Sequence, residues 1–167
     1  MTNNSTAQSY TPGKLDAEDL LPPLPRLDAD SRPYWEAAAR GELIIQRCSE
    51  CDTARFYPRL LCPKCWSDHC RWTQASGKGT IYSYSVVHRA PSPAFRNSVP
   101  YVVALVDLDE DVRVFTKIHG DRRRVHIGAP VEVCFHRVTE SISLPEFVLC
   151  QGDADMTESL VTIVGSN

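Results

Sequence analysis

Hydrophobic runs of five to nine residues alternate with short polar stretches along the second half of the chain. The runs are rich in β-branched and aromatic residues, and proline, glycine and acidic residues separate them. None has the period of an amphipathic helix. Five strands within about 80 residues predict a small closed or nearly closed barrel. The predicted strands are Thr80–His88, Tyr101–Leu108, Val112–Ile118, Val131–Val138 and Glu146–Cys150.

The segment SRPYWEAAARGEL predicts one short helix before these strands. Ser31 suits the N-cap, Pro33 suits the first turn, and Gly41 can end the helix. We expect Tyr34 and Trp35 on its buried side. Two further strands are expected between the helix and the barrel, at Leu43–Arg47 and Ala54–Leu60.

Four cysteines form two C-x2-C pairs, Cys48 with Cys51 and Cys62 with Cys65, and ten residues separate the pairs. Each C-x2-C turn places two sulfurs on one side of a tight knuckle. Two knuckles at the ends of a hairpin then bring four thiolates to tetrahedral positions about 2.3 Å from one Zn²⁺. Four thiolates leave no open coordination position, so the spacing predicts one structural zinc per chain. A four-thiolate iron site and two unrelated pairs of buried or redox cysteines are the alternatives.

The chain has seven cysteines, an odd number, and its polar start, MTNNSTAQ, lacks the hydrophobic core of a signal peptide. Hydrophobic runs are also far shorter than the ~18 residues that cross a bilayer. We therefore expect a cytoplasmic protein without membrane contact, whose cysteines are metal ligands or thiols rather than disulfides. Cys70, Cys134 and Cys150 are expected to be free thiols.

The helix, the cysteine pairs and the strands occur together in an order that resembles the DUF35 family. The resemblance covers about residues 31–150 and depends on RPYWEAAARGELIIQRCSECDTARFYPRLLCPKCWS, GKGTIYSYSVVHRAPSPAF, PYVVALVDLDEDVRVFTKIHGD and HIGAPVEVCFHR. Family members join an N-terminal helix, a rubredoxin-like zinc ribbon and an OB-fold. Asp52 and Trp66 depart from the family, because a glycine commonly follows the second cysteine of each knuckle.

The resemblance implies a mainly β fold, with an N-terminal helix, a rubredoxin-like zinc ribbon and a C-terminal five-stranded OB-fold barrel. We divide the chain accordingly into an extended N-terminal arm (1–29), the helix and lead-in strand (30–45), the zinc ribbon (46–70), the OB-fold (71–151) and a C-terminal tail (152–167). The arm is rich in proline, and the tail is acidic and then weakly apolar.

Family members are similar to accessory subunits that bind acyl-CoA and assemble with thiolase-like enzymes or with hot-dog-fold enoyl-CoA hydratases. By this resemblance the chain is the small subunit of a hetero-oligomer with a thiolase-like catalytic subunit, and a hydratase-like partner is the alternative. Nucleophile-elbow and phosphate-loop motifs are absent from the sequence. We expect no catalytic residue in the chain itself; of its histidines, His88 is the leading candidate for a chemical role.

A surface that binds CoA needs cationic side chains for the phosphates and apolar area for the pantetheine. Arg89, Phe95 and Arg96 lie together in the proline-rich segment 88–100, so we take them as candidate CoA contacts. A second basic cluster is Arg122–Arg124. Ordinary solvated loop charges are the alternative interpretation of both clusters.

A zinc ribbon joined to an OB-fold also occurs in nucleic-acid-binding proteins, which use a basic face with stacking aromatics. The net charge of −3 conceals a basic centre, because residues 46–100 carry eight basic and three acidic side chains. Residues 101–167 carry six basic and eleven acidic side chains, however, and the isoelectric point is about 5.9. The charge distribution therefore argues against nucleic acid, which stays as a second alternative to the CoA-ester complex that the resemblance implies.

Overall fold

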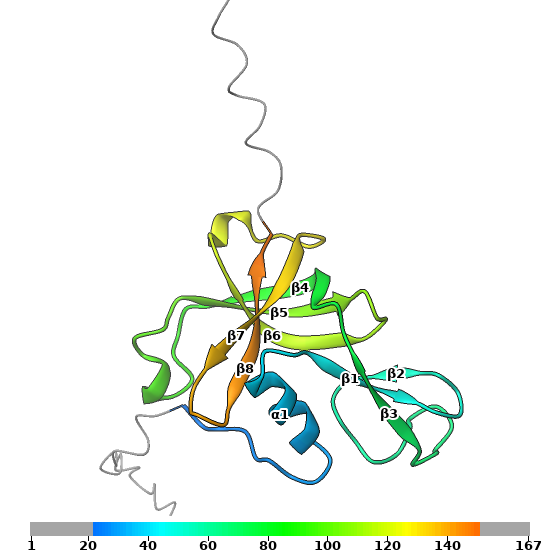
Figure 1. Cartoon of the computed structure of the whole chain (residues 1–167). Coiled ribbons are helices and arrows are strands. Elements are labelled where there is room, and N and C mark those ends of the chain that lie inside the picture. The colour runs from blue at the N-terminus through cyan, green and yellow to red at the C-terminus, as the bar shows by residue number, and fades with distance from the viewer. Residues whose placement is uncertain (1–21, 151–167) are drawn as a thin grey trace, which may run out of the picture.

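A computed structural model describes residues 22–150 of the chain, and its architecture is mainly β (Figure 1). One helix, a three-stranded sheet and a closed five-stranded barrel follow one another along the chain. The predicted fold class is therefore confirmed. Most of the predicted arm and all of the predicted tail lie outside the described residues. The helices of residues 22–150 include none that is both long and apolar enough to span a membrane.

Helix α1 (Arg32–Ala39) matches the predicted helix, with Pro33 in its first turn and Gly41 beyond its end at a φ of 80°. Ser31 stands at the N-cap position, but its hydroxyl does not cap the helix. It donates a hydrogen bond to the Asp28 carboxylate instead, at 2.5 Å. Tyr34 and Trp35 are buried as expected.

Strands β1 (Ile44–Cys48), β2 (Ala54–Arg55) and β3 (Cys70–Gln74) form an antiparallel sheet in the order β2-β1-β3. β2 is shorter than the expected strand Ala54–Leu60. The reason is local: Pro58 has no N–H, and the Gln46 side-chain oxygen takes the Arg59 N–H at 3.0 Å. The expected boundary between ribbon and barrel at residues 70 and 71 falls inside β3, which pairs with β1 along its whole length.

The barrel closes in the order β4-β5-β6-β8-β7. Every pairing is antiparallel except the one between β6 and β8, which is the arrangement of a five-stranded Greek-key OB-fold. All five strands overlap the predicted ones. Their bounds are β4 (Lys78–Val87), β5 (Tyr101–Leu108), β6 (Arg113–His119), β7 (Pro130–Arg137) and β8 (Ser143–Leu149).

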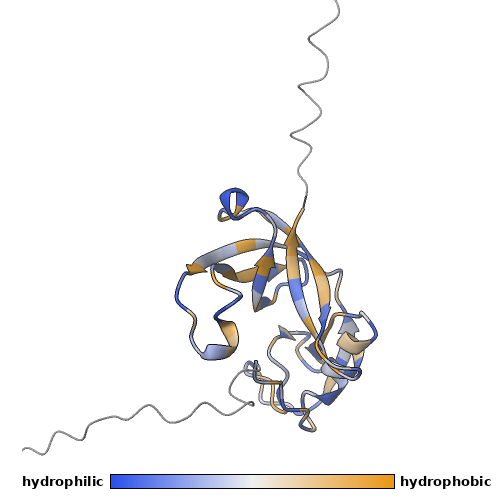
Figure 2. Cartoon of the chain, turned by 90° about the vertical axis from the view of Figure 1, so that its left-hand side faces the viewer, coloured by the Kyte–Doolittle hydropathy of each residue, from blue (hydrophilic) through white to orange (hydrophobic). Residues whose placement is uncertain are grey.

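The barrel interior and the buried face of α1 share one hydrophobic core. Phe147, Ile81 and Val106 fill the barrel with at most 1% exposure, and α1 contributes Tyr34 and Trp35 to the same cluster. Figure 2 shows hydrophobic and hydrophilic residues alternating along the barrel strands, as expected for strands with one face in the core. The helix thus fixes the three-stranded sheet and the barrel to a common core, which holds the surfaces described below in place.

Candidate functional site

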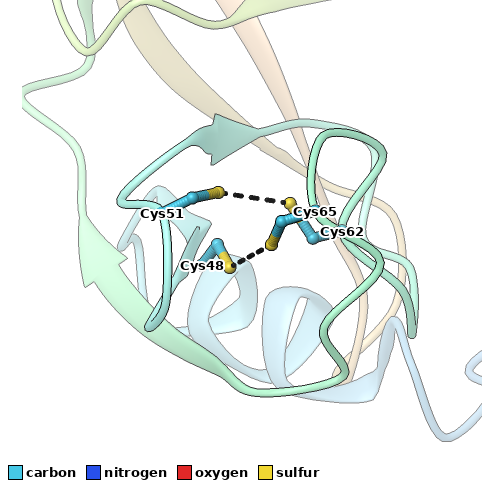
Figure 3. A group of neighbouring side chains, drawn as sticks. All are labelled: Cys48, Cys51, Cys62 and Cys65. Carbon is cyan, nitrogen blue, oxygen red and sulfur yellow. Dashed lines mark hydrogen bonds between the residues drawn. The ribbon is translucent and has the colours of Figure 1, made fainter.

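The cysteines of the two pairs form one cluster at the end of the three-stranded sheet (Figure 3). All four sulfur atoms lie within 4.8 Å of one another. The sulfurs of Cys48 and Cys65 are 3.5 Å apart, and those of Cys51 and Cys62 are 3.7 Å apart. Cys48 and Cys62 are buried, whereas Cys65 is exposed. The structure therefore brings together the four residues that the spacing predicts as ligands.

Matching backbone hydrogen bonds close the two knuckles. In the first, the Asp52 N–H donates to the Cys48 carbonyl at 3.1 Å; in the second, the Trp66 N–H donates to the Cys62 carbonyl at 2.9 Å. Asp52 and Trp66 have φ values of 56° and 63°, the left-handed region that favours glycine. Each side chain there costs about 1 kcal/mol. Asp52 and Trp66, which replace the glycines common in the family, therefore adopt the same left-handed turn at a conformational cost.

Neighbouring hydrogen-bond donors and the short sulfur–sulfur distances shift the pKa values of Cys51 and Cys65 in opposite directions. Hydrogen bonds from the side chain and backbone of Thr53 lower the pKa of the Cys51 thiol to about 6. Despite the Ser67 backbone N–H, which lowers it, the pKa of Cys65 is raised to about 12 because the Cys51 sulfur and desolvation disfavour its thiolate. Four thiolates packed this closely need a compensating cation, and Zn²⁺ suits an all-thiolate tetrahedral set.

Two arginines brace the first knuckle from outside the cluster. Arg47 and Arg71 both pair with the Asp52 carboxylate, Arg47 at 3.6 Å. Arg71 also donates to the Cys48 carbonyl at 3.2 Å. Asp52 therefore has a structural role at its left-handed position, because its carboxylate links β1 to β3.

A second candidate feature is a groove between α1, the ribbon and the outer face of the barrel. Its main hollow has a volume of about 470 Å³, and a smaller one of about 180 Å³ shares five lining residues with it. The walls are mostly aromatic, as in sites for small molecules with apolar parts. The groove lies on strands β5 and β6, the face that OB-folds use for ligands. Its principal lining residues are Trp35, Tyr57, Phe95, Tyr101, Phe115 and Lys117.

Few polar groups enter this groove. The Lys117 ammonium lies 5.8 Å from the centre of the Tyr101 ring. Glu146, whose side chain is 12% exposed, lies 2.5 Å from the Nε2 atom of His119. The buried indole N–H of Trp35 has no hydrogen-bond partner among residues 22–150. The groove therefore offers a mainly apolar surface that carries one ammonium group and one carboxylate, whereas the Trp35 N–H is buried.

The three candidate CoA contacts separate in the structure. Phe95 belongs to the short 3-10 helix η2 (Pro93–Phe95) and lines both hollows, with its ring centre 6.2 Å from that of Tyr101. Arg89 and Arg96 are exposed on the same loop and do not line either hollow. His88 is exposed as well.

Tyr101, Phe115 and Lys117 line the groove but are not among the residues predicted from the sequence. Tyr101 and Lys117 occupy positions of β5 and β6 that alternate with buried ones. This alternation could have indicated from the sequence that both side chains lie on the outer face of the barrel. Phe115 is 69% exposed although its neighbours Val114 and Thr116 are buried, so it stands out as an aromatic side chain on the outer face. The contribution of α1 to the groove has no such signal in the sequence.

Comparison with known families matches both parts of the fold. Residues 35–72 match the family described as "ChsH2, rubredoxin-like zinc ribbon domain". Residues 72–136 match "ChsH2, C-terminal OB-fold domain". The two matches meet at β3, which agrees with the pairing of that strand in the ribbon sheet.

Several curated proteins are similar to the chain. A "DUF35 domain-containing scaffold protein" of Methanocaldococcus jannaschii is 41% identical over 111 residues, which are 65% of this chain and 78% of that protein. A "Probable enoyl-CoA hydratase alpha subunit" of Thermomonospora curvata is 40% identical over 83% of this chain, but the chain spans only 44% of its length. "Benzoylsuccinyl-CoA thiolase subunit BbsA" of Geobacter metallireducens is 32% identical over 45% of this chain and 49% of that protein.

A solved structure is similar over the whole length of one of its chains. The structure titled "Ltp2-ChsH2(DUF35) aldolase" superposes with a TM-score of 0.68 at 38% identity. The match covers 75% of this chain and 98% of the solved one. Three quarters of this chain therefore corresponds to nearly all of that solved chain.

Proposed function

This chain belongs to the DUF35 family, and from that membership we propose that it is the small, non-catalytic, zinc-containing subunit of a complex that processes CoA esters. The observation that carries the proposal is the match to 98% of one chain in the aldolase structure. The partner we propose is a thiolase-like catalytic subunit, as the relative named as a benzoylsuccinyl-CoA thiolase subunit supports. Thiolate ligands and unpaired thiols suit a reducing compartment, so we place the complex in the cytoplasm.

The proposed metal ligands are Cys48, Cys51, Cys62 and Cys65. Their sulfurs converge within 4.8 Å, and the family of residues 35–72 is a zinc ribbon. With all four positions taken by thiolates, the metal has no place for water or substrate, so its contribution is to the fold. It joins the loop before β2 to the loop before β3, a segment with little hydrophobic core of its own.

The proposed ligand of the groove is the acyl-CoA substrate of the complex. Phe95 and its aromatic neighbours provide apolar area of the kind that a pantetheine or acyl chain contacts. Arg89 and Arg96 lie on the loop at the rim, where a CoA phosphate can be reached from outside the hollow. Lys117 adds one cation within the groove.

A hydratase-like partner is the second candidate, because the relative from Thermomonospora curvata is named as an enoyl-CoA hydratase alpha subunit. Both candidates share the surfaces described above and differ only in the catalytic subunit. The two are separated by the reaction of the complex: bond cleavage or formation between carbons for a thiolase-like partner, and addition of water to an enoyl-CoA for a hydratase.

The proposal is tested by purifying the tagged chain from its own cells and identifying the subunits bound to it by mass spectrometry. We expect a thiolase-like protein in a stable complex, and turnover of a CoA ester by the complex but not by this chain alone. Recovery of the chain free of any CoA-ester enzyme, or turnover by the chain alone, would contradict the proposal.

A further inference from the structure

The second cysteine knuckle carries an exposed hydrophobic surface made by Leu60, Leu61 and Trp66. Their exposed fractions are 61%, 43% and 74%. The N–H of Cys62 donates to the Ser67 carbonyl at 2.8 Å, which holds the chain at Leu61 beside the chain at Trp66. Large apolar side chains gathered on one loop of a small ribbon are typical of an interaction site. We call these three residues the knuckle surface.

Trp66 has no evident role in the fold of the ribbon itself. It adopts a left-handed conformation in which glycine would be unstrained, and its side chain makes no hydrogen bond or aromatic pair among residues 22–150. Asp52, at the equivalent position of the first knuckle, uses its carboxylate to pair with Arg47 and Arg71. Strained residues that persist without a structural contact point to a function outside the chain.

Charge around the knuckle surface restricts what can bind there. Arg59 and Lys64 are exposed beside it, and no carboxylate among the described residues pairs with either; the nearby Asp68 carboxylate lies 3.6 Å from the His69 ring. A second copy of this chain, docked face to face, would oppose these cations to their own equivalents, so self-association through this surface is disfavoured. A different protein with acidic groups around an apolar pocket would be complementary.

We propose that the knuckle surface docks the catalytic subunit of the complex, with the Trp66 indole in an apolar pocket whose rim carries carboxylates. This inference rests on the proposed function, since it names the surface through which that partner binds. Exposed tryptophans that become buried on binding are common hot spots, whereas surrounding charges mainly affect the association rate. Trp66 therefore contributes most of the binding free energy of this surface, and Arg59 and Lys64 increase the association rate.

The decisive variant is Trp66→Gly, because a structural role and a docking role predict opposite effects. Glycine relieves the left-handed strain, so the variant should bind zinc at the same stoichiometry and melt at the same or a higher temperature. Its affinity for the purified catalytic subunit, measured by biolayer interferometry, should fall by about 30-fold or more. Ile127→Ala is the matched control, since Ile127 is 67% exposed on the barrel and should bind as the wild type does.

A second variant tests the charges. Arg59→Glu with Lys64→Glu should slow association at low salt, and the difference from wild type should shrink as salt rises. Trp66→Gly that binds the catalytic subunit as tightly as wild type, or that loses zinc, would overturn the inference. Sedimentation showing a dimer of the chain alone that Trp66→Gly dissolves would also overturn it. Absence of any CoA-ester enzyme from the native complex would instead contradict the proposed function.

Discussion

The sulfurs of Cys48 and Cys65 lie 3.5 Å apart, although the two residues are 17 positions apart along the chain. Cys48 ends strand β1, whereas Cys65 belongs to a knuckle between β2 and β3. The hydrogen-bonded sheet brings the two loops near each other. Four thiolates at such distances are stabilised only by a cation that all of them bind. The ribbon is therefore organised around its metal, and the surfaces beside it depend on that metal.

Removal of the metal should unfold the cysteine loops of the ribbon and spare much of the barrel, because Phe147, Ile81 and Val106 stay packed without the metal. We expect one zinc per chain by elemental analysis and none after Cys62→Ser. Hydrogen exchange should then show loss of protection across residues 46–70, with protection retained in β5 and β6. Cys134→Ser is the matched control, because Cys134 lies outside the cluster and should leave the zinc content unchanged. Full zinc occupancy in Cys62→Ser would contradict the ligand assignment.

Phe147→Ala should destabilise the barrel by about 3–5 kcal/mol, because it empties a site with 1% exposure at the centre of the core. The free energy of unfolding from urea titration measures this loss. Phe115→Ala is the matched control: its ring is 69% exposed, so we expect a change of about 0.5 kcal/mol or less. Equal losses in the two variants would contradict the inside–outside assignment of the strands.

Much of this fold follows from the sequence where one physical requirement dominates. The strand at Tyr101–Leu108 has its predicted bounds because burial alternates along it, and the cysteine spacing brings its four sulfurs together. β2 is shorter than predicted because a side chain, Gln46, takes a hydrogen bond that strand pairing would otherwise use. The groove could not be predicted, since it depends on how α1 packs against β8 and so comes to line one hollow together with β5 and β6.

Substitution of the loop residues tests the proposed CoA contacts. Arg89→Ala with Arg96→Ala should raise the KM of the complex for its CoA ester by about 30-fold, because two charge-assisted contacts of roughly 1 kcal/mol each are lost. Phe95→Ala should raise it too. The matched control is Arg122→Ala with Arg124→Ala, a basic pair on the turn η3 (Arg122–Arg124) that lines neither hollow. An unchanged KM in the loop variants would contradict the proposed contacts of Arg89, Phe95 and Arg96 with CoA.

Trp35→Phe tests whether the unpartnered indole donor serves the groove. The ring stays large and apolar and an unsatisfied buried N–H disappears, so the free energy of unfolding should change by about 1 kcal/mol or less. Because this nitrogen is buried, we expect the KM of the complex for its CoA ester to stay unchanged. Trp72→Phe is the control, since Trp72 on β3 does not line the groove. A several-fold rise in KM for a stable Trp35→Phe variant would contradict this expectation and show that the ester reaches the indole N–H.

Reconstitution of activity tests whether the complex requires this chain for turnover. The purified chain, the purified catalytic subunit and their equimolar mixture are each assayed on the CoA ester that the native complex turns over. We predict no turnover by this chain alone, weak or no turnover by the catalytic subunit alone, and full turnover by the mixture. Full activity of the catalytic subunit without this chain, or activity of this chain by itself, would contradict a required, non-catalytic subunit.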